Sequence, residues 1–285
     1  MATAAGRTTG EDALGAFVRS HPRLLVLTGA GCSTASGIPG YRDRDGQWKG
    51  RPPVQYADFV GSDHARRRYW SRSLLGWQRV SSAEPNATHR ALAVLERAGV
   101  VRTLVTQNVD GLHQRAGSRR VVDLHGRLDE VECLECGGRV ARADVQAQLL
   151  AWNPSYREAL ASGLAAPARP DGDADWEADL SEFVVPPCAA CGGVLKPAVV
   201  FFGENVPRSR VDAVLAALDA ADALLVVGSS LMVFSGYRFC LAAQAAGKPV
   251  AAVNDGTTRA DALLALKVED DCGSVLSRLA EELVR

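Results

Sequence analysis

Short apolar runs recur along the chain, and stretches with helical periodicity separate several of them. The runs do not alternate with polar residues, and several end at glycine or small polar residues. This pattern is typical of strands that are buried on both faces in a parallel sheet. We predict such strands at residues 24–27, 100–106, 121–124, 199–202, 223–227 and 249–253.

Apolar residues at helical spacing predict helices between these strands. Asn86 is a suitable N-cap for one helix, and Gly99 is a suitable C-cap for it. The predicted helices cover residues 11–19, 62–80, 86–98, 208–220 and 236–246, and a last one opens at 271–273. The alternation of strands and helices indicates an α/β fold with a doubly wound parallel sheet.

The helix predicted at 62–80 combines basic residues with aromatic ones, including Arg66, Arg67, Tyr69 and Trp70. Such a combination occurs in proteins that bind nucleic acid. A helix that exposes its charged side to solvent and packs through its aromatic side chains is the favoured interpretation.

Composition and charge narrow the class of protein. With 285 residues, the chain is long enough for one large domain or for a large domain with a small one. Its formal net charge of −1 predicts no general attraction to nucleic acid or to an anionic membrane. No apolar run reaches the length of a membrane span, and residues 1–20 lack the apolar core of a signal peptide. We therefore expect a soluble, cytoplasmic protein, and the excess of arginine over lysine fits a bacterial source.

A glycine-rich loop, Gly29-Ala30-Gly31, follows the first predicted strand. Glycine allows a tight turn and a close approach of the backbone to a ligand. Ser33 and Thr34 are placed to cap a following helix, whose free N–H groups would face a phosphate. The loop lacks the full G-x-G-x-x-G pattern, so an ordinary strand-to-helix turn remains an alternative to a nucleotide site.

Polar residues follow several of the other predicted strands. Residues 107–113 (QNVDGLH), 228–230 (GSS) and 254–256 (NDG) lie where an open α/β sheet binds its ligands. His125 follows the strand at 121–124. A single histidine is usually a hydrogen-bonded structural residue, although its place between a strand and a metal-type motif strengthens the case for catalysis.

Residues 43–53 are polar and contain two glycines and two prolines, so they cannot hold regular structure for long. Beside a nucleotide site, such a segment is either a mobile lid or a plain surface loop. Both interpretations remain open.

Two C-x-x-C-G-G units are the strongest chemical signal in the chain. Each places two thiolates around one turn, and two such units form a tetrahedral site for one zinc ion. Four sulfurs leave no open coordination position, so the zinc is expected to be structural rather than catalytic; a redox dithiol is the competing interpretation. The predicted ligands are Cys133, Cys136, Cys188 and Cys191. Residues 165–176 between the units are rich in proline, glycine and aspartate and predict an ordered loop in the zinc module.

The chain resembles the sirtuin family from about Leu24 to its C-terminus. The matching motifs, in order, are TGAGCSTASGIPGYR, TQNVDGLH, LHG, the two C-x-x-C pairs, KPAVVFFGE, VVGSSL and VN. The segments RRRYWSRSLLGW, APARPDGDADW and SGYRF resemble the class II branch of that family. Lipoamidase and ADP-ribosyltransferase activities are associated with this branch, besides deacylation.

The resemblance implies an NAD-dependent protein lysine deacylase with a Rossmann-like domain and a small zinc module. Residues 1–20 would form an N-terminal helix or extension. The NAD-binding domain would comprise residues 21–130 and 195–285, with a helical insertion at about 52–82. The zinc module would comprise residues 131–194. Acyl-lysine proteins would be the substrates, and a monomer is expected.

The same resemblance implies roles for individual residues at the NAD site. The pyrophosphate would be held by Gly29, Ala30, Gly31 and Ser33. Tyr41 and Arg42 would cover the nicotinamide side, where many members have an acidic residue followed by Phe in place of Gly40-Tyr41. Ribose and the nicotinamide carboxamide would be bound by Gln107, Asn108 and Asp110. The adenosine half would be contacted by Gly228, Ser229, Ser230, Asn254 and Cys272.

For the chemistry, the resemblance implies that His125 is the general base, with Asn108 also in the catalytic set. The acyl-lysine would bind along Val200, Phe201, Phe202, Gly203 and Glu204. Tyr69 and Arg72 lie at i and i+3 on one helix face and resemble the Tyr/Arg pair with which desuccinylases hold acidic acyl groups. A packed tyrosine with a solvated arginine is the alternative interpretation.

Two other functions remain open from the sequence. The same NAD site would serve a protein mono-ADP-ribosyltransferase or a lipoamidase. A non-catalytic module that senses NAD or binds partners through its zinc ribbon would leave His125 without a role.

Overall fold

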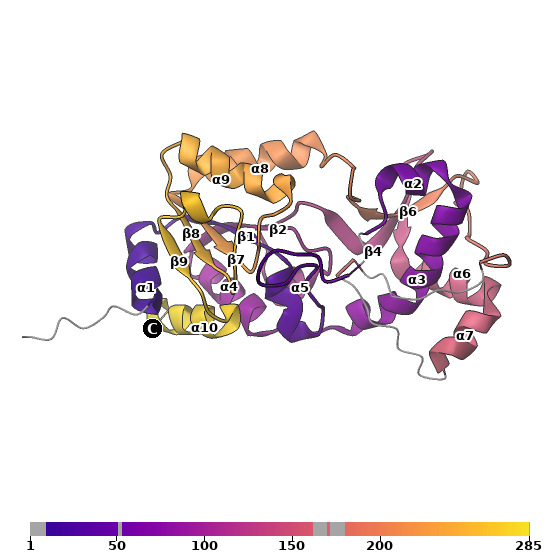
Figure 1. Cartoon of the computed structure of the whole chain (residues 1–285), viewed down its shortest axis with the longest axis horizontal. Helices are drawn as coiled ribbons and strands as arrows, with labels where there is room; N and C mark the ends of the chain where they lie inside the picture. The colour runs from indigo at the N-terminus through magenta and orange to yellow at the C-terminus, as the bar shows by residue number, and fades with distance from the viewer. Residues whose placement is uncertain (1–9, 51–52, 162–169, 172–179, 285) are drawn as a thin grey trace, which may run out of the picture.

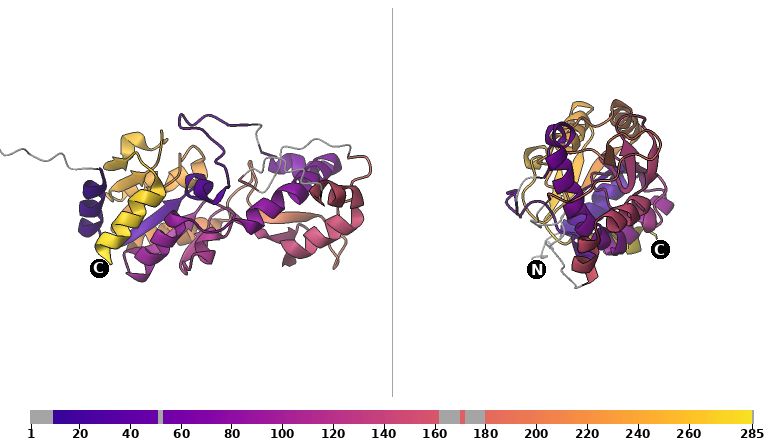
Figure 2. Two further views of the ribbon diagram at one scale, coloured as in Figure 1. Left: turned by 90° about the horizontal axis from the view of Figure 1, so that it is seen from below. Right: turned by 90° about the vertical axis from the view of Figure 1, so that its right-hand side faces the viewer.

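The computed structural model describes residues 10–50, 53–161, 170–171 and 180–284. It consists of a larger lobe built on a parallel sheet and a smaller lobe around an antiparallel sheet, set end to end (Figures 1 and 2). Within these described ranges, no helix is both long enough and apolar enough to cross a membrane.

The sheet of the larger lobe has six strands in the order β3-β2-β1-β7-β8-β9, and all neighbouring pairs are parallel. The strands are β1 (Leu24–Thr28), β2 (Val101–Thr106), β3 (Val121–Asp123), β7 (Ala223–Val227), β8 (Val250–Val253) and β9 (Leu266–Val268). The first five were predicted from their apolar runs, and the doubly wound fold class is confirmed. The short strand β9 was not predicted, because Lys267 interrupts its apolar pattern.

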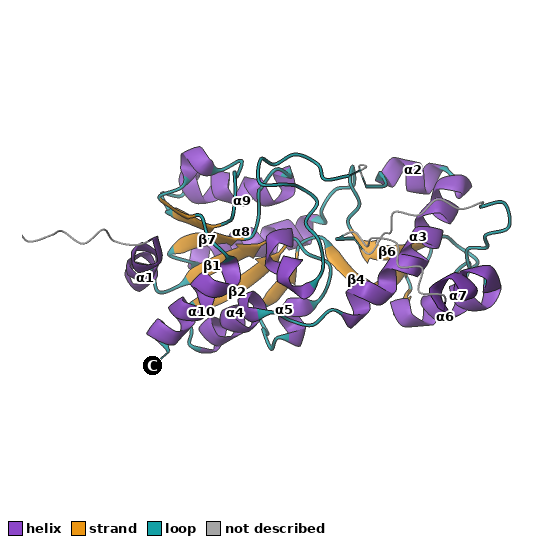
Figure 3. Ribbon diagram, turned by 60° about the horizontal axis from the view of Figure 1, so that its bottom comes forward, coloured by secondary structure: helices purple, strands orange, loops and turns teal. Residues whose placement is uncertain are grey.

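Helices cover both faces of this sheet (Figures 1 and 3). In β1, Leu24 and Val26 pack with one set of helices, and Leu25 and Leu27 pack with the other. Successive side chains of a strand point to opposite faces, which is why the uninterrupted run at 24–27 feeds two cores. The first face carries α1 (Gly10–Ser20), α4 (Ala87–Arg97) and α10 (Cys272–Leu283). The second carries α8 (Arg208–Ala220) and α9 (Phe234–Ala245).

The smaller lobe is built on an antiparallel sheet in the order β5-β4-β6. Its strands are β4 (Gly126–Cys133), β5 (Arg139–Ala141) and β6 (Leu195–Val199). Its helices are α2 (Tyr56–Gly61), α3 (Asp63–Ser82), α6 (Arg142–Trp152) and α7 (Pro154–Ala161). Trp70 of α3 is fully buried in the core of this lobe, so the helix predicted at 62–80 does pack through its aromatic residues. Most of the loop predicted at 165–176 lies outside the described residues.

The prediction of a parallel-sheet strand at 199–202 is wrong. We assigned it to the parallel sheet, but the strand is β6 and pairs antiparallel with β4 in the smaller lobe. Beyond Val199 the chain leaves the sheet, and the backbone of Phe202 forms an isolated parallel bridge with Gln55. An apolar run indicates that a strand is buried, but it does not indicate which of two sheets the strand joins. Here Phe201 packs in the core of the smaller lobe rather than in the parallel sheet.

Candidate functional site

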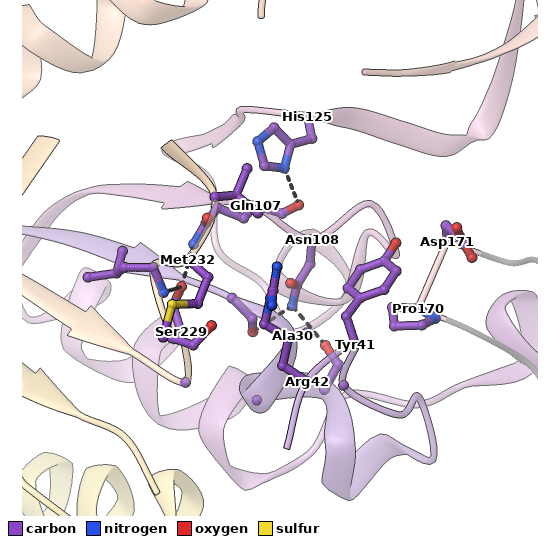
Figure 4. Close-up of a pocket in the computed structure, with 18 of the residues that line it drawn as sticks. Ala30, Tyr41, Arg42, Gln107, Asn108, His125, Pro170, Asp171, Ser229 and Met232 are labelled. Atoms are coloured by element: carbon purple, nitrogen blue, oxygen red, sulfur yellow. Dashed lines mark hydrogen bonds between the residues drawn. The ribbon is translucent and has the colours of Figure 1, made fainter. Parts of the chain in front are cut away.

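A cavity of about 750 Å³ lies at the carboxyl ends of the parallel strands and is lined by both lobes. β1 pairs with β2 on one side and with β7 on the other, so the strand order reverses at β1. The crevice beside such a reversal is the usual ligand site of open α/β sheets. In Figure 4, Gln107 and Asn108 lie below His125, with Tyr41 and Asp171 to the right.

The cavity brings together nearly all residues that the sequence indicated. It is lined by the glycine loop and the strand ends at Gly29, Ala30, Gly31, Ser33, Gln107, Asn108, Asp110, Gly228, Ser229, Ser230, Asn254 and Cys272. It also includes Tyr41, Arg42, Tyr69, His125, Val200, Phe201, Phe202, Gly203 and Glu204. Arg72 is buried in α3 and is absent from this lining.

The glycine loop after β1 packs directly on the loop after β7. The N–H of Gly31 donates to the carbonyl of Gly228 at 2.8 Å. A Cβ atom at Gly31 would lie 2.8 Å from that same oxygen, and one at Gly29 would lie 2.7 Å from the Cβ of Ser229. Both positions therefore require glycine because two backbones approach closely.

The capping role predicted for Ser33 and Thr34 is wrong. Residues Ala30–Ser36 form a short 3-10 helix whose N-cap, Gly29, receives no side-chain hydrogen bond. Ser33 Oγ instead donates to a carboxylate oxygen of Asp110 at 2.7 Å, and Thr34 Oγ1 donates to the carbonyl of Gly31. Both hydroxyls therefore bond to acceptors other than the free N–H groups of the turn, and two of those N–H groups are bonded as well, Gly31 to the carbonyl of Gly228 and Cys32 to the carbonyl of Gly29.

Amide side chains connect the strand ends around the cavity. Asn108 Nδ2 donates to the carbonyl of Gly29 and to Ser33 Oγ, both at 3.0 Å. Gln107 Nε2 donates to Ser229 Oγ at 2.7 Å, which links β2 to the loop after β7. Burial raises the pKa of Asp110, although its hydrogen bonds from Leu112 N–H and Ser33 oppose the shift. The polar groups are thus held in fixed positions before any ligand arrives.

His125 lies between β3 and β4, with its ring in the cavity. Its Nδ1 lies 2.8 Å from the backbone carbonyl of Gln107, and its Nε2 lies 2.7 Å from Ser235 Oγ. A carbonyl oxygen only accepts hydrogen bonds, so Nδ1 carries the proton and Nε2 has the lone pair that accepts a hydrogen bond. Burial lowers the pKa of His125 to about 4, against the hydrogen bond to Gln107, and the positive charges of Arg210 and Arg238 lower it further. His125 is therefore a neutral base at pH 7.

The segment 43–50 folds against the cavity. The guanidinium of Arg42 lies 4.0 Å from the centre of the Trp48 ring, and Nη1 donates to the carbonyl of Gly46. The rings of Tyr41, Trp48 and Phe202 form edge-to-face contacts. Of the two interpretations left open, these contacts favour a covering segment with its own packing over a plain surface loop.

Lys196 supports the segment at 200–204 and was not singled out from the sequence. Its ammonium group is fully buried, donates to the carbonyl of Val199 at 2.7 Å, and lies 3.2 Å from carboxylates of both Glu132 and Glu204. Glu204 in turn accepts from the N–H of Phe201 at 2.8 Å. A buried cation needs such partners, so the lysine fixes this wall of the cavity. The only sequence signal was its place in the motif KPAVVFFGE.

Sequence reasoning also gave no role to Ser235 and Arg238, although both line the cavity. They lie in the motif SGYRF, which was used only for the resemblance. Pro170 and Asp171 line the cavity as well. No pattern around them marks a binding residue.

The four predicted zinc ligands gather at one point in the smaller lobe. Their sulfur atoms all lie within 4.8 Å of one another, with 3.5 Å between Cys133 and Cys191 and 3.8 Å between Cys136 and Cys188. A tetrahedral zinc ion at about 2.3 Å from each sulfur separates the sulfurs by about 3.8 Å. The cluster fits one zinc ion with a closed, all-thiolate ligand set.

The two cysteine turns have the same backbone structure. In each, the first cysteine donates its N–H to the carbonyl of the second glycine, at 2.9 Å for Cys133 and 2.8 Å for Cys188. The first glycines, Gly137 and Gly192, have φ of +70° and +77°, a region that favours glycine. This geometry explains the repeated C-x-x-C-G-G spacing.

A doubly wound α/β lobe with a polar cavity at its topological switch point, joined to a four-cysteine zinc module, defines a class of nucleotide-binding, zinc-containing proteins. A model of the Sir2 family matches residues 29–235. The chain belongs to the Sir2 family, as the motifs indicated.

Relatives and solved structures agree with this membership. An NAD-dependent protein deacetylase of Bordetella bronchiseptica is 57% identical over 96% of this chain and 98% of its own length. A solved structure described as "Structural Basis for the Mechanism and Regulation of Sir2 Enzymes" has a TM-score of 0.73 and 32% identity, over 97% of this chain and 98% of that one. Another, described as "Sir2-p53 peptide-NAD+", has a TM-score of 0.73 and 28% identity, over 95% and 97%.

Proposed function

We propose that the protein is an NAD-dependent protein deacetylase that releases nicotinamide, free lysine and O-acyl-ADP-ribose. The observation that carries the proposal is the neutral His125, whose Nδ1 proton is fixed by Gln107 and whose Nε2 lies in the cavity. The fixed tautomer directs the Nε2 lone pair to accept a proton, and the lowered pKa keeps the ring unprotonated at neutral pH, as a general base must be before it acts. The name of the 57% identical relative supports the same activity.

The residues of the cavity fit NAD. The close contact of Gly31 with Gly228 gives a backbone surface on which a pyrophosphate can lie, since no side chain covers it. Gln107, Asn108 and Asp110 offer donors and acceptors for the nicotinamide ribose and the carboxamide. The adenosine half would bind along Gly228, Ser229, Ser230, Asn254 and Cys272. Tyr41 and Arg42 would cover the nicotinamide side, because segment 43–50 packs beside them.

The acyl-lysine would enter between the lobes along Val200–Glu204. This segment is tied to the base, because the N–H of Val200 donates to the carbonyl of His125 at 2.8 Å. Lys196 and Glu204 hold its shape from behind. The description of a similar solved structure names both a peptide and NAD+, which supports a site for two substrates.

In the reaction, bound NAD supplies the ribose carbon that loses nicotinamide and takes up the acyl oxygen of the substrate. The protein's part is to orient both substrates and to exclude water, which Asn108 and the covering segment at 43–50 are placed to do. Nε2 of His125 then accepts the proton of a ribose hydroxyl, so that the hydroxyl oxygen can attack the acyl carbon. The zinc ion, with its closed thiolate set, would stabilise the smaller lobe and take no part in this step.

The test is mass spectrometry of a peptide panel incubated with the purified protein, with and without NAD. The panel carries acetyl, longer fatty acyl, succinyl, glutaryl and lipoyl lysine. NAD-dependent loss of an acyl group together with O-acyl-ADP-ribose is the expected result, and it identifies the preferred chain. No loss on any peptide by a protein that binds zinc and NAD would contradict the proposal. ADP-ribose attached to a protein would then indicate the transferase that the sequence left open. The predicted cytoplasmic location and monomeric state remain predictions.

A further inference from the structure

Helix α9 presents one face to the side of the cavity that holds His125. Phe234, Ser235 and Arg238 share this face, since residues three and four apart lie together on a helix, and all three line the cavity. The guanidinium of Arg238 lies 5.1 Å from the centre of the Phe234 ring. Phe234 is 52% exposed, so this pair marks the rim of the cavity.

Arg238 carries a positive charge that no acidic side chain of the described residues neutralises. Among the described residues, no carboxylate lies within ion-pair distance of its guanidinium, and its buried Nε atom donates no hydrogen bond. Two other cations at the cavity do have such partners: Arg44 pairs with Asp255, and Lys196 pairs with Glu204. A buried donor without an acceptor is costly, so a ligand that supplies one gains affinity.

The position of Arg238 relates it to the acyl-lysine substrate rather than to NAD. Ser235, one turn earlier on the same face, contacts His125. Gly236 lies on another face of α9 and packs on Gln107. A Cβ atom at Gly236 would lie 2.4 Å from Oε1 of Gln107. The nucleotide side of α9 is therefore the face of Gly236, and Arg238 faces the base and the rim.

We propose that Arg238 binds a carboxylate of the acyl-lysine substrate. The proposal rests on the deacetylase function proposed above and names its substrate class. A guanidinium pairs with a carboxylate through two parallel hydrogen bonds, which a lysine ammonium cannot reproduce. The carboxylate can come from an acidic side chain next to the acyl-lysine or from the end of the acyl chain. The ligand chemistry is the same for both sources, and the experiment separates them.

The experiment uses four peptides in a two-by-two design: acetyl or glutaryl lysine, each with neutral or acidic flanking residues. KM and kcat are measured for the full-length wild type, Arg238→Gln and Arg238→Lys. The control variant is Arg259→Gln, because Arg259 also stacks on an aromatic ring of α9, Tyr237, but does not line the cavity. Assays at pH 8 keep His125 neutral in every variant.

The expected result is a roughly tenfold or larger rise in KM for Arg238→Gln, only with peptides that carry the relevant carboxylate. A rise with acidic flanks in both acyl forms identifies the flanking side chain, and a rise with both glutaryl peptides identifies the acyl chain. Arg238→Lys should recover only part of the loss. Equal KM values for wild type and Arg238→Gln on all four peptides, or an equal rise on all four, would overturn the proposal. A selective rise in the KM for NAD would also overturn it.

A binding measurement separates this proposal from the deacetylase function. Fluorescence anisotropy with labelled forms of the same peptides, in the presence of ADP-ribose, requires no turnover. If the wild type binds carboxylate peptides more tightly than neutral ones and Arg238→Gln does not, the Arg238 site stands even if no peptide is deacylated. If turnover is normal but this preference is absent, the Arg238 site fails while the deacetylase function stands.

Discussion

Ser235 Oγ and His125 Nε2 lie 2.7 Å apart, and the direction of the hydrogen bond between them is fixed. The proton of the ring is on Nδ1, where Gln107 accepts it, so the serine hydroxyl must donate to Nε2. The lone pair that a general base uses is therefore occupied before substrates bind. A ribose hydroxyl must take the place of Ser235 to reach the base, and it meets a nitrogen that is already correctly oriented.

The first prediction concerns Ser235→Ala. Burial is the main cause of the low pKa of His125, about 4, and the serine hydroxyl adds to it by donating to the neutral ring; its removal should raise this pKa, while burial keeps it below the ordinary value near 6.5. The base is active when neutral, so the acid limb of kcat/KM should move to higher pH by the same amount. Titration of the His125 ring by NMR measures the shift directly. Ser81→Ala, at an exposed site of α3, is the control, and an unchanged pKa in Ser235→Ala would contradict the assignment.

The second prediction is that His125→Ala abolishes turnover and leaves NAD binding largely intact. Loss of a general base typically costs about 10²–10⁴ in rate. The groups expected to bind NAD are held by other contacts, such as Asn108 to Gly29 and Gln107 to Ser229. Single-turnover kinetics and calorimetric titration with NAD measure the two effects separately. Replacement of the exposed His64 by alanine is the matched control, and turnover at the wild-type level in His125→Ala would refute the role.

Much of the fold was readable because its signals are local. The run Leu24–Leu27 had to be buried on both faces, and Asn86 caps α4 with its side chain as predicted. The cysteine spacing predicted the cluster because the residues of each C-x-x-C-G-G unit form the turn that brings its two cysteines together. In each case the residues that carry the signal lie within a few positions of one another.

Features that depend on contacts between distant residues were missed or misread. Strand β6 was placed in the wrong sheet because an apolar run does not specify its partner, which here is β4. Ser33 was assigned to a helix cap because Asp110, its actual partner, is far away in the sequence. No local pattern marked Ser235 and Arg238 as site residues. They become so because folding brings them close to His125, which is far away in the sequence.

The third prediction concerns the zinc site. Cys136→Ser should lose most of the zinc and lower the melting temperature, because structural zinc contributes on the order of 10–16 kcal/mol in isolated finger peptides. Cys136 is exposed, so the loss of packing is small and the effect reports on the metal. Metal analysis and differential scanning calorimetry give the two readouts. Cys240→Ala, at a buried cysteine outside the cluster, should keep one zinc ion per chain. Full zinc retention by Cys136→Ser would exclude the four-cysteine assignment.

The fourth prediction follows from the buried pair His89 and His113, whose ring centres are 4.7 Å apart. Burial lowers the pKa of His89 to about 4, with a further contribution from Arg90, and burial lowers the pKa of His113 well below its usual value. The unfolded chain binds protons near pH 6.5, so stability is fully present above that pH and is lost as the pH falls toward 4. The slope should reach about 1.4 kcal/mol per pH unit for each such histidine.

Urea unfolding at pH 8 and pH 5 measures this loss. His89→Gln removes one titrating group and should make the difference between the two pH values smaller. His64→Gln, at an exposed position, should leave the difference unchanged. An identical pH dependence in wild type and His89→Gln would show that the buried pair does not control acid stability.

The last prediction concerns Tyr69 and Arg72, which share a face of α3. Tyr69 lines the cavity, whereas Arg72 is only 5% exposed and is not among the lining residues. If the pair holds acidic acyl groups, Arg72→Ala should lose activity on succinyl and glutaryl peptides by roughly tenfold more than on an acetyl peptide. The ratio of the two activities in one preparation cancels any general loss of folded protein. Tyr69→Phe, which preserves the ring packing, should shift the ratio in the same direction by a smaller amount. An equal ratio in wild type and Arg72→Ala would mean that the arginine is a buried structural residue of the smaller lobe and that acyl preference is set elsewhere in the cavity.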